Sequence, residues 1–356
     1  MRRIGIEERR ARLGVRHHLA GSAVASSPVE AAQGVVALHS TDPASVFLSV
    51  YARTPPVDVE AIERDLYVER SLIRMLGMRR TMWVVPVELA PVVQAAATRA
   101  IAALQRRRYA QLLAAAGVGD ADWLAAVEDA TARALAARGE ATGAQLSADE
   151  PRLRTKVLLA EGKPYAAQQN ITTWVLFMLA ADGRIVRGRP LGSWTSSQYR
   201  WSPVESWLPD GVVEPTPEAA RAELARRWLA AFGPATIADL KWWTGWTASH
   251  VKQALAAIRP AEVDLDGATG LLLPGDLEPV AKPEPWVALL PALDPTPMGW
   301  SQRSWYLGPH APVLFDRSGN VGPTVWSDGR IVGGWAQRAD GEIAYRLLED
   351  VGSETA

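Results

Sequence analysis

The chain has 356 residues, of which 48% are hydrophobic and 22% charged, and its net charge is -1. This composition indicates a folded, water-soluble protein of two to four domains and excludes a disordered or fibrous chain. No apolar run approaches the roughly 20 residues that a membrane span needs, and the N-terminus lacks the apolar core of a signal peptide, so we expect a cytoplasmic protein. Without cysteine the chain has neither disulfides nor thiolate metal sites.

The small net charge conceals a gradient along the chain. Residues 1–119 hold 16 Lys and Arg against 10 Asp and Glu, residues 120–256 hold 15 of each, and residues 257–356 hold 7 against 14. A basic surface in the first third is what a nucleic-acid-binding protein presents. Charge alone equally allows a solvated basic face that has no partner.

In the first hundred residues, helices precede a pair of strands. Apolar spacing predicts helices at 7–19 and 59–69 and helical segments after Pro28 and Pro43. The runs 72–75 and 81–85 then read as the two strands of a hairpin. Helices followed by a hairpin are the element order of a winged helix.

A polar break separates two apolar runs within this region, 35–38 and 46–51. It consists of His39, Ser40, Thr41 and Asp42, followed by Pro43. Asp before Pro is typical of a helix start, with Asp as the N-cap and Pro in the first helical position. Because a helix N-terminus presents unpaired N–H groups and the positive end of the helix dipole, it also suits an anion or a polarised water. The break is therefore a predicted helix cap and the best candidate for chemistry.

The same order of elements recurs twice. Between 122 and 203 we expect helices at 123–137 and 171–181 and strands at 184–187 and 199–201. The pattern is clearest from 217, where a helix ends at Phe232, a second helix is capped by Thr236, and a turn at 244–246 leads to a third helix from Thr247. Strands at 262–265 and 270–273 follow. Three tandem winged helix-turn-helix subdomains explain this periodicity most economically.

After residue 275 the chain turns to Pro, Gly, Trp and short apolar runs, at 287–290, 313–316, 324–326, 330–335 and 343–348. Pairs such as Asp328-Gly329 mark tight turns between strands. We predict an α+β fold: winged helices at 1–100, 101–214 and 215–280, then a small β-rich domain, a curled sheet or partial barrel, at 281–356.

Several common chemistries lack their motifs. Gly162-Lys163 is followed by Pro164, so there is no phosphate-binding loop, and the five histidines lack metal-binding spacing. No G-x-S-x-G motif provides a serine nucleophile. We therefore expect no nucleotide, no metal and no other cofactor.

These features resemble a known family. The repeats, the polar break after Leu38, the segment 76–86 and the run from Leu290 to Trp335 are similar to those of the AlkZ/YcaQ-type DNA glycosylases, across nearly the whole chain. Members of that family consist of three tandem winged helices and a C-terminal β-domain. The resemblance implies excision of alkylated purines of the N7-alkylguanine type from duplex DNA, and of interstrand crosslinks in some members, without metal or cofactor.

The family's catalytic signature is Gln-x-Gln or Gln-x-Asp, and here these positions read His39-Ser40-Thr41-Asp42. An N7-alkylguanine is already cationic, so catalysis mainly requires a positioned water and stabilisation of an oxocarbenium-like sugar. We assign His39 as general base or water-positioner, Thr41 as its hydrogen-bonding partner, and Asp42 as electrostatic stabiliser and cap. Packing for His39 and capping for Thr41 are the structural alternatives.

Basic residues near predicted helix ends and hairpins are candidate DNA contacts. They are Arg70, Arg74, Arg79, Arg80, Lys241, Lys252 and His310. Trp242, Trp243, Trp246, Trp300 and Trp305 are expected to fill cores, because tryptophan buries a large area.

The leading hypothesis is a monomeric DNA glycosylase with damaged duplex DNA as its partner. The alternative is a winged-helix protein that binds DNA without catalysis, as a regulator or a damage-recognition protein. Such a protein would show steep salt dependence and no base release. The acidic C-terminal part keeps a third possibility open, a protein-interaction scaffold.

Overall fold

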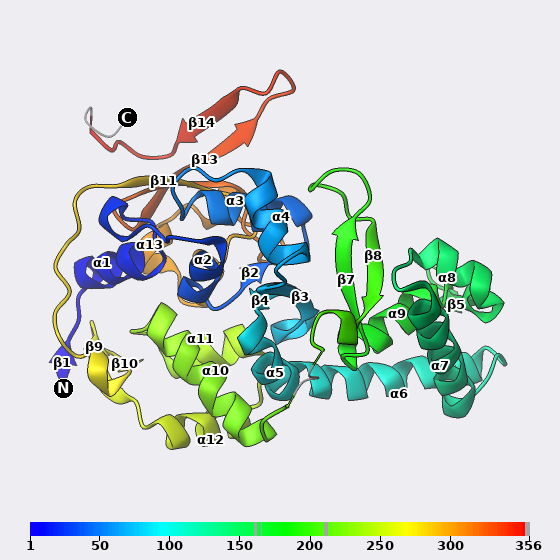
Figure 1. Cartoon of the computed structure of the whole chain (residues 1–356). Coiled ribbons are helices and arrows are strands. Elements are labelled where there is room, and N and C mark those ends of the chain that lie inside the picture. Colours follow the sequence, from blue (N-terminus) through cyan, green and yellow to red (C-terminus); the bar gives the residue numbers. More distant parts are fainter. Residues whose placement is uncertain (160–161, 165, 210–212, 353–356) are drawn as a thin grey trace.

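The computed structural model describes residues 1–159, 162–164, 166–209 and 213–352. It is a mixed α+β molecule in which the middle of the chain, from α6 to β8, extends to one side of the remainder (Figure 1). The last four residues of the predicted C-terminal domain lie outside the described residues.

The first hundred residues form the helices and the hairpin predicted from their spacing. The elements are β1 (Arg2–Arg3), α1 (Ile6–Arg16), α2 (Pro28–Gly34), β2 (Leu38–His39), α3 (Pro43–Tyr51), α4 (Val59–Tyr67), β3 (Leu72–Leu76) and β4 (Met82–Pro86). Ser27, Asp42 and Asp58 each cap the helix that follows by accepting a backbone N–H at its third position. The strands form an antiparallel sheet in the order β2-β4-β3.

The middle of the chain is mainly helical. Its elements are α5 (Ala90–Val93), a π-helical turn (Gln94–Thr98), α6 (Arg99–Ala115), α7 (Ala121–Arg138), α8 (Gly143–Asp149), β5 (Lys156–Leu159), β6 (Ala167–Asn170), α9 (Thr172–Ala181), β7 (Ile185–Pro190) and β8 (Tyr199–Pro203). The β5-β6 hairpin was not expected, because its second strand, Ala-Gln-Gln-Asn, has no apolar alternation. One helical stretch, Val87–Ala115, is long and apolar enough to cross a membrane by length and composition, and half of its most apolar 18-residue window is buried within the protein.

The third group of elements follows the prediction closely. They are α10 (Pro217–Phe232), α11 (Ile237–Thr244), α12 (Ala248–Ile258), β9 (Ala261–Leu265) and β10 (Ala268–Leu272). Thr236 and Asp239 form a capping box, and Gly245 ends α11 with φ 72°, a left-handed conformation that glycine adopts without strain. The N-terminal β1 pairs in parallel with β9, which adds a third strand to the hairpin. The arrangement of the three groups as winged helices stays a prediction.

The C-terminal strands form an open antiparallel sheet in the order β11-β12-β13-β14. Its elements are β11 (Val287–Leu290), α13 (Ser304–Leu307), α14 (Ala311–Leu314), β12 (Thr324–Ser327), β13 (Arg330–Gln337) and β14 (Ile343–Leu347). The prediction of a strand at 313–316 is wrong, because α14 occupies the first part of this run. Pro312 lies in the first turn of α14, where its fixed φ suits a helix and its missing N–H costs nothing.

The described part of the chain has two large hydrophobic cores and a small third cluster, which joins Ile4 to the β9-β10 hairpin. The larger unites distant parts of the chain, including Leu38 of β2, Trp228 of α10 and Trp326 of β12. The smaller contains mainly residues between 76 and 201, among them Leu135 and Trp174. The first and third groups of elements and the C-terminal sheet therefore pack as one body, while the middle of the chain has a core of its own.

Candidate active site and nucleic-acid interface

The polar break lies at the end of β2, and the sheet divides its side chains between two faces. Leu38 pairs with Val84, which pairs with Arg74, whereas His39 pairs with Trp83. Paired residues share a face and successive residues alternate. His39 therefore lies on the same face as Trp83, and Arg74 lies on the opposite face.

His39 is buried, with 7% of its surface exposed, and its ring stands edge-on to Trp83 with the centroids 5.2 Å apart. The Thr41 backbone N–H approaches Nδ1 at 3.5 Å, which favours the tautomer that carries the proton on Nε2. Burial lowers the pKa of His39 to about 4, Arg79 acts in the same direction, and Asp42 and Asp294 oppose the shift. His39 is therefore neutral at pH 7 and a weaker base than an ordinary histidine.

Asp42 performs the predicted capping role and stays exposed. Its Oδ2 accepts the Ser45 backbone N–H at 3.0 Å and lies 2.8 Å from the Ser45 hydroxyl. Among the described residues, no hydrogen bond reaches Oδ1. Thr41 is also exposed. The helix N-terminus thus presents a hydroxyl and half of a carboxylate to solvent beside a neutral imidazole.

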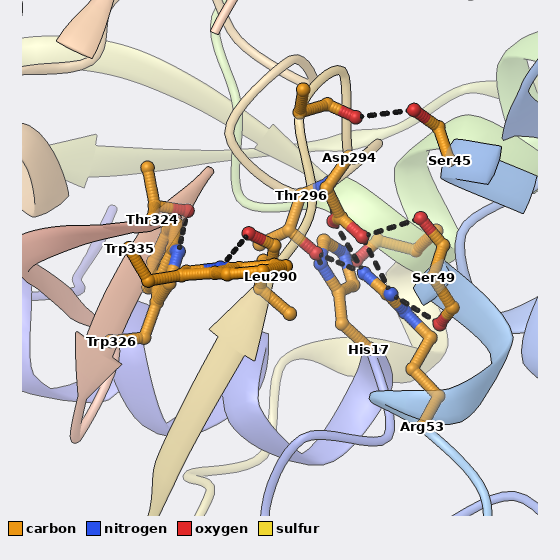
Figure 2. A network of polar contacts seen from close by, with 12 residues as sticks. His17, Ser45, Ser49, Arg53, Leu290, Asp294, Thr296, Thr324, Trp326 and Trp335 are labelled. Carbon is orange, nitrogen blue, oxygen red and sulfur yellow. Dashed lines mark hydrogen bonds and ion pairs between the residues drawn. The ribbon is translucent and has the colours of Figure 1, made fainter. Parts of the chain in front are cut away.

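A buried polar network fixes α3 against the segment that follows β11 (Figure 2). Arg53 and Asp294 form a fully buried ion pair, and the Ser49 hydroxyl donates to Asp294 at 2.8 Å. Thr296 accepts a hydrogen bond from Arg53 at 2.7 Å and lies 2.9 Å from Nδ1 of His17. This network joins α3, which begins after Asp42, to the segment that follows β11.

Four of the predicted DNA contacts lie on the surface. Arg79 and Arg80 are exposed in the turn between β3 and β4, and Lys241 and Lys252 are exposed on α11 and α12. The Arg79 guanidinium lies 4.2 Å from the centre of the Trp242 ring. The turn of the first hairpin therefore meets α11.

The other three predicted contacts are engaged within the protein. Arg70 donates to the carbonyl oxygen of Ser206, and Arg74 is buried on β3. His310 lies 3.2 Å from Glu349 near the C-terminal sheet. Their DNA contacts stay predictions.

Sequence reasoning missed Arg187 and Arg303. Arg303 packs against the Trp242 ring at 4.9 Å, so that Trp242 has two guanidinium neighbours, and Arg187 lies against Tyr199 and Trp201. Arginine alternating along a strand, as in β7, is also typical of a solvated surface, so nothing in the sequence distinguished Arg187. The expected burial of Trp243, Trp246, Trp300 and Trp305 is confirmed. In the part of the chain that the structure describes, no cluster of three or more His, Asp or Glu could hold a metal ion.

Comparison with protein-family models identifies the family of this chain. A model of the AlkZ-like DNA glycosylases matches residues 32–355. The chain belongs to the AlkZ-like DNA glycosylase family. The structure of Streptomyces sahachiroi DNA glycosylase AlkZ is similar in fold to this AlkZ-like protein, with a TM-score of 0.76 and 19% sequence identity over 98% of this chain and 92% of that one. Comparison with the curated proteins gives no match.

Proposed function

We propose that this AlkZ-like protein is a DNA glycosylase that hydrolyses the N-glycosidic bond of alkylated purines, of the N7-alkylguanine type, in duplex DNA. The observation that carries the proposal is the exposed pair Thr41 and Asp42 at the N-terminus of α3, beside a buried neutral His39, in a chain of this family. The surface arginines and lysines of the β3-β4 turn, α11 and α12 would bind the DNA backbone.

The low pKa of His39 changes the roles that we assign. A base works best when its pKa lies near the operating pH, so His39 is poorly suited to take a proton from water. Its Nε2–H instead serves as a donor that orients water. Asp42 is the better group to accept the water's proton and to offset positive charge on the sugar, because its Oδ1 is not used by the helix cap. Thr41 supplies a second hydrogen bond to the water.

The test is base release from a duplex that contains N7-methylguanine. Asp42→Asn keeps the N-cap, since Asn caps as well as Asp, but removes the negative charge. We expect at least a tenfold lower rate constant of base release at saturating enzyme, which corresponds to about 1.4 kcal/mol of barrier. Asp58→Asn changes the same kind of N-cap, on α4, and should leave the rate unchanged. Equal rates for Asp42→Asn and the native protein would remove Asp42 from the mechanism.

A second function, DNA binding without catalysis, is favoured by one observation. His39 is buried and neutral, and its Nδ1 faces the backbone N–H of Thr41. A histidine with a purely structural role has the same features. Such a protein would bind damaged duplex tightly, lose affinity steeply with salt and release no base. Finding no release above the spontaneous rate, with binding intact, would establish this function in place of the first.

A further inference from the structure

Arg74 is a buried cation whose outer nitrogens are not used. It is 4% exposed, and its Nε donates to the Ser40 hydroxyl at 2.6 Å. Neither Nη1 nor Nη2 has a hydrogen-bond partner among the described residues. A buried guanidinium with free donors is costly unless a ligand satisfies them, because its charge has lost the hydration of bulk water.

A second guanidinium lies beside the first. The Cζ of Arg74 is 4.5 Å from the centre of the Tyr199 ring, and the Cζ of Arg187 is 5.4 Å from the same centre. Burial lowers the pKa of Arg187, and the positive charge of Arg74 lowers it further. Two like charges thus face one ring from β3 and β7.

No carboxylate neutralises this pair within the described part of the chain. Two acidic groups act on these tyrosines through their charge: Glu63 pairs with Arg189, and Asp42 caps α3 through Oδ2. The hydroxyls of Tyr67 and Tyr199 are buried, and neither has a hydrogen-bond partner among the residues that the structure describes. The Arg74 guanidinium therefore lies beside two hydroxyls that can both donate and accept, and Arg74 opposes the rise in the pKa of each tyrosine that burial causes.

The two arginines also line a cavity of about 270 Å³, together with apolar residues such as Met75 and Phe177. Three carboxylates line it as well: Asp182 and Glu214, which pair with Arg106 and Arg99, and Glu205. The cavity lies between the β2-β4-β3 sheet and the β7-β8 hairpin, where the two cores of the molecule meet. The cavity borders both arginines, whereas Tyr67 and Tyr199 are not part of its lining.

We propose that Arg74 and Arg187, with the hydroxyls of Tyr67 and Tyr199, form an anion site that receives a phosphate group, and that the source of this group is a phosphodiester of bound DNA. Guanidinium groups match phosphate in charge and geometry. The Arg74–Ser40 hydrogen bond joins the site to the segment that carries Thr41 and Asp42, on the face of the sheet opposite to His39. A phosphate held there would fix the DNA strand beside the candidate catalytic segment. The inference rests on the DNA binding of the proposed function and does not require base release.

The test compares duplex binding by Arg187→Gln and by Arg200→Gln. Arg187 makes no side-chain hydrogen bond within the described residues, so its substitution should leave the fold intact. Arg200, also on the β7-β8 hairpin, pairs with Glu140 and gives a control with the same change of charge. In fluorescence anisotropy across a salt series, we expect Arg187→Gln to reduce the slope of log K against log salt by about 1, the value for one lost phosphate contact. Arg200→Gln should leave the slope unchanged.

A scan with duplexes that carry one uncharged methylphosphonate then locates the contact. At one position near the lesion, replacing the charged phosphate by methylphosphonate should weaken DNA binding by the native protein. The same replacement should not weaken binding by Arg187→Gln any further. Tyr199→Phe, which removes only a hydroxyl, should weaken binding less at the same position. These variants should have unchanged melting temperatures, so that a loss of affinity is not a loss of fold.

A separate arm measures the melting temperature in inorganic phosphate against chloride at equal ionic strength. A phosphate-dependent rise that Arg187→Gln abolishes, with no effect on DNA binding, would support the anion site and assign it to a free phosphate compound. If Arg187→Gln and Arg200→Gln behave alike in both arms, the anion site does not exist.

Discussion

Arg53 and Asp294 meet in a fully buried, two-pronged ion pair, with Nη1 to Oδ2 at 2.8 Å and Nη2 to Oδ1 at 2.7 Å. The pair joins Arg53, the second residue after α3, to the loop after β11, 241 positions away in the chain. Ser49 and Thr296 add hydrogen bonds to the pair, while the buried Nε of Arg53 has no partner among the described residues. The position of the candidate catalytic segment therefore depends on residues near the other end of the sequence.

Asp294→Asn should destabilise the protein strongly, because it leaves the Arg53 guanidinium buried without its counter-charge. Breaking a buried pair by removing one partner costs about 3–5 kcal/mol, which urea unfolding measures. Asp149→Asn removes the partner of Arg138 on the surface and should change stability little. Replacing both members, Arg53→Met with Asp294→Leu, should recover much of the loss. A small effect of Asp294→Asn alone would show that water reaches the site.

The stability of the protein should fall in acid partly through His39. Its pKa is about 4 in the folded protein and 6.5 in the unfolded chain, so below pH 6.5 the unfolded state binds the extra proton. The contribution of neutral His39 to the free energy of unfolding is complete above pH 6.5 and is lost progressively as the pH falls to 4. The loss amounts to about 3 kcal/mol at 1.36 kcal/mol per pH unit. His39→Gln, which cannot titrate, should show a correspondingly smaller loss. His17 has a lowered pKa too, but it is present in both proteins, so their difference isolates His39. Parallel stability curves for the two proteins would contradict the shift.

Trp242 should contribute to DNA binding by holding two cations in place. Arg79 and Arg303 lie 4.2 and 4.9 Å from its ring centre, and each such contact is worth roughly 0.5–2 kcal/mol. Trp242→Ala should therefore weaken duplex binding about 3- to 10-fold, whereas Trp242→Phe should weaken it less. Trp123→Ala, at a similarly half-buried tryptophan on α7, is the control. Unchanged affinity in Trp242→Ala would mean that the two arginines do not need the ring.

Helix starts were predictable because their signals are local. Asp42-Pro43 and Thr236 with Asp239 carry the cap chemistry within four residues, and both caps form. The pairing of β1 with β9 was not predictable, since a two-residue strand has no pattern and its partner is about 260 residues away. The mixed α+β class followed from composition and periodicity.

The candidate site was only partly predictable. The polar break drew attention to His39, Thr41 and Asp42, but burial decides the basicity of His39, and burial is a tertiary property. The sequence grouped Arg74 with Arg79 and Arg80 as surface cations. Strand alternation and the β7-β8 hairpin instead place Arg74 inside, next to Arg187. Such neighbours come from parts of the chain that no short motif connects.

The large shared core has a consequence for synthesis on the ribosome. Leu38 and Phe47 emerge early, but their common core also requires Trp228 and Trp326, which emerge much later. Until then the first third of the chain exposes apolar surface, and the Arg53 guanidinium lacks its partner Asp294. The middle segment, whose core is nearly self-contained, can fold during this wait. Nascent chains halted before residue 280 should therefore be protease-resistant mainly between residues 99 and 203, and should bind chaperones through their first hundred residues.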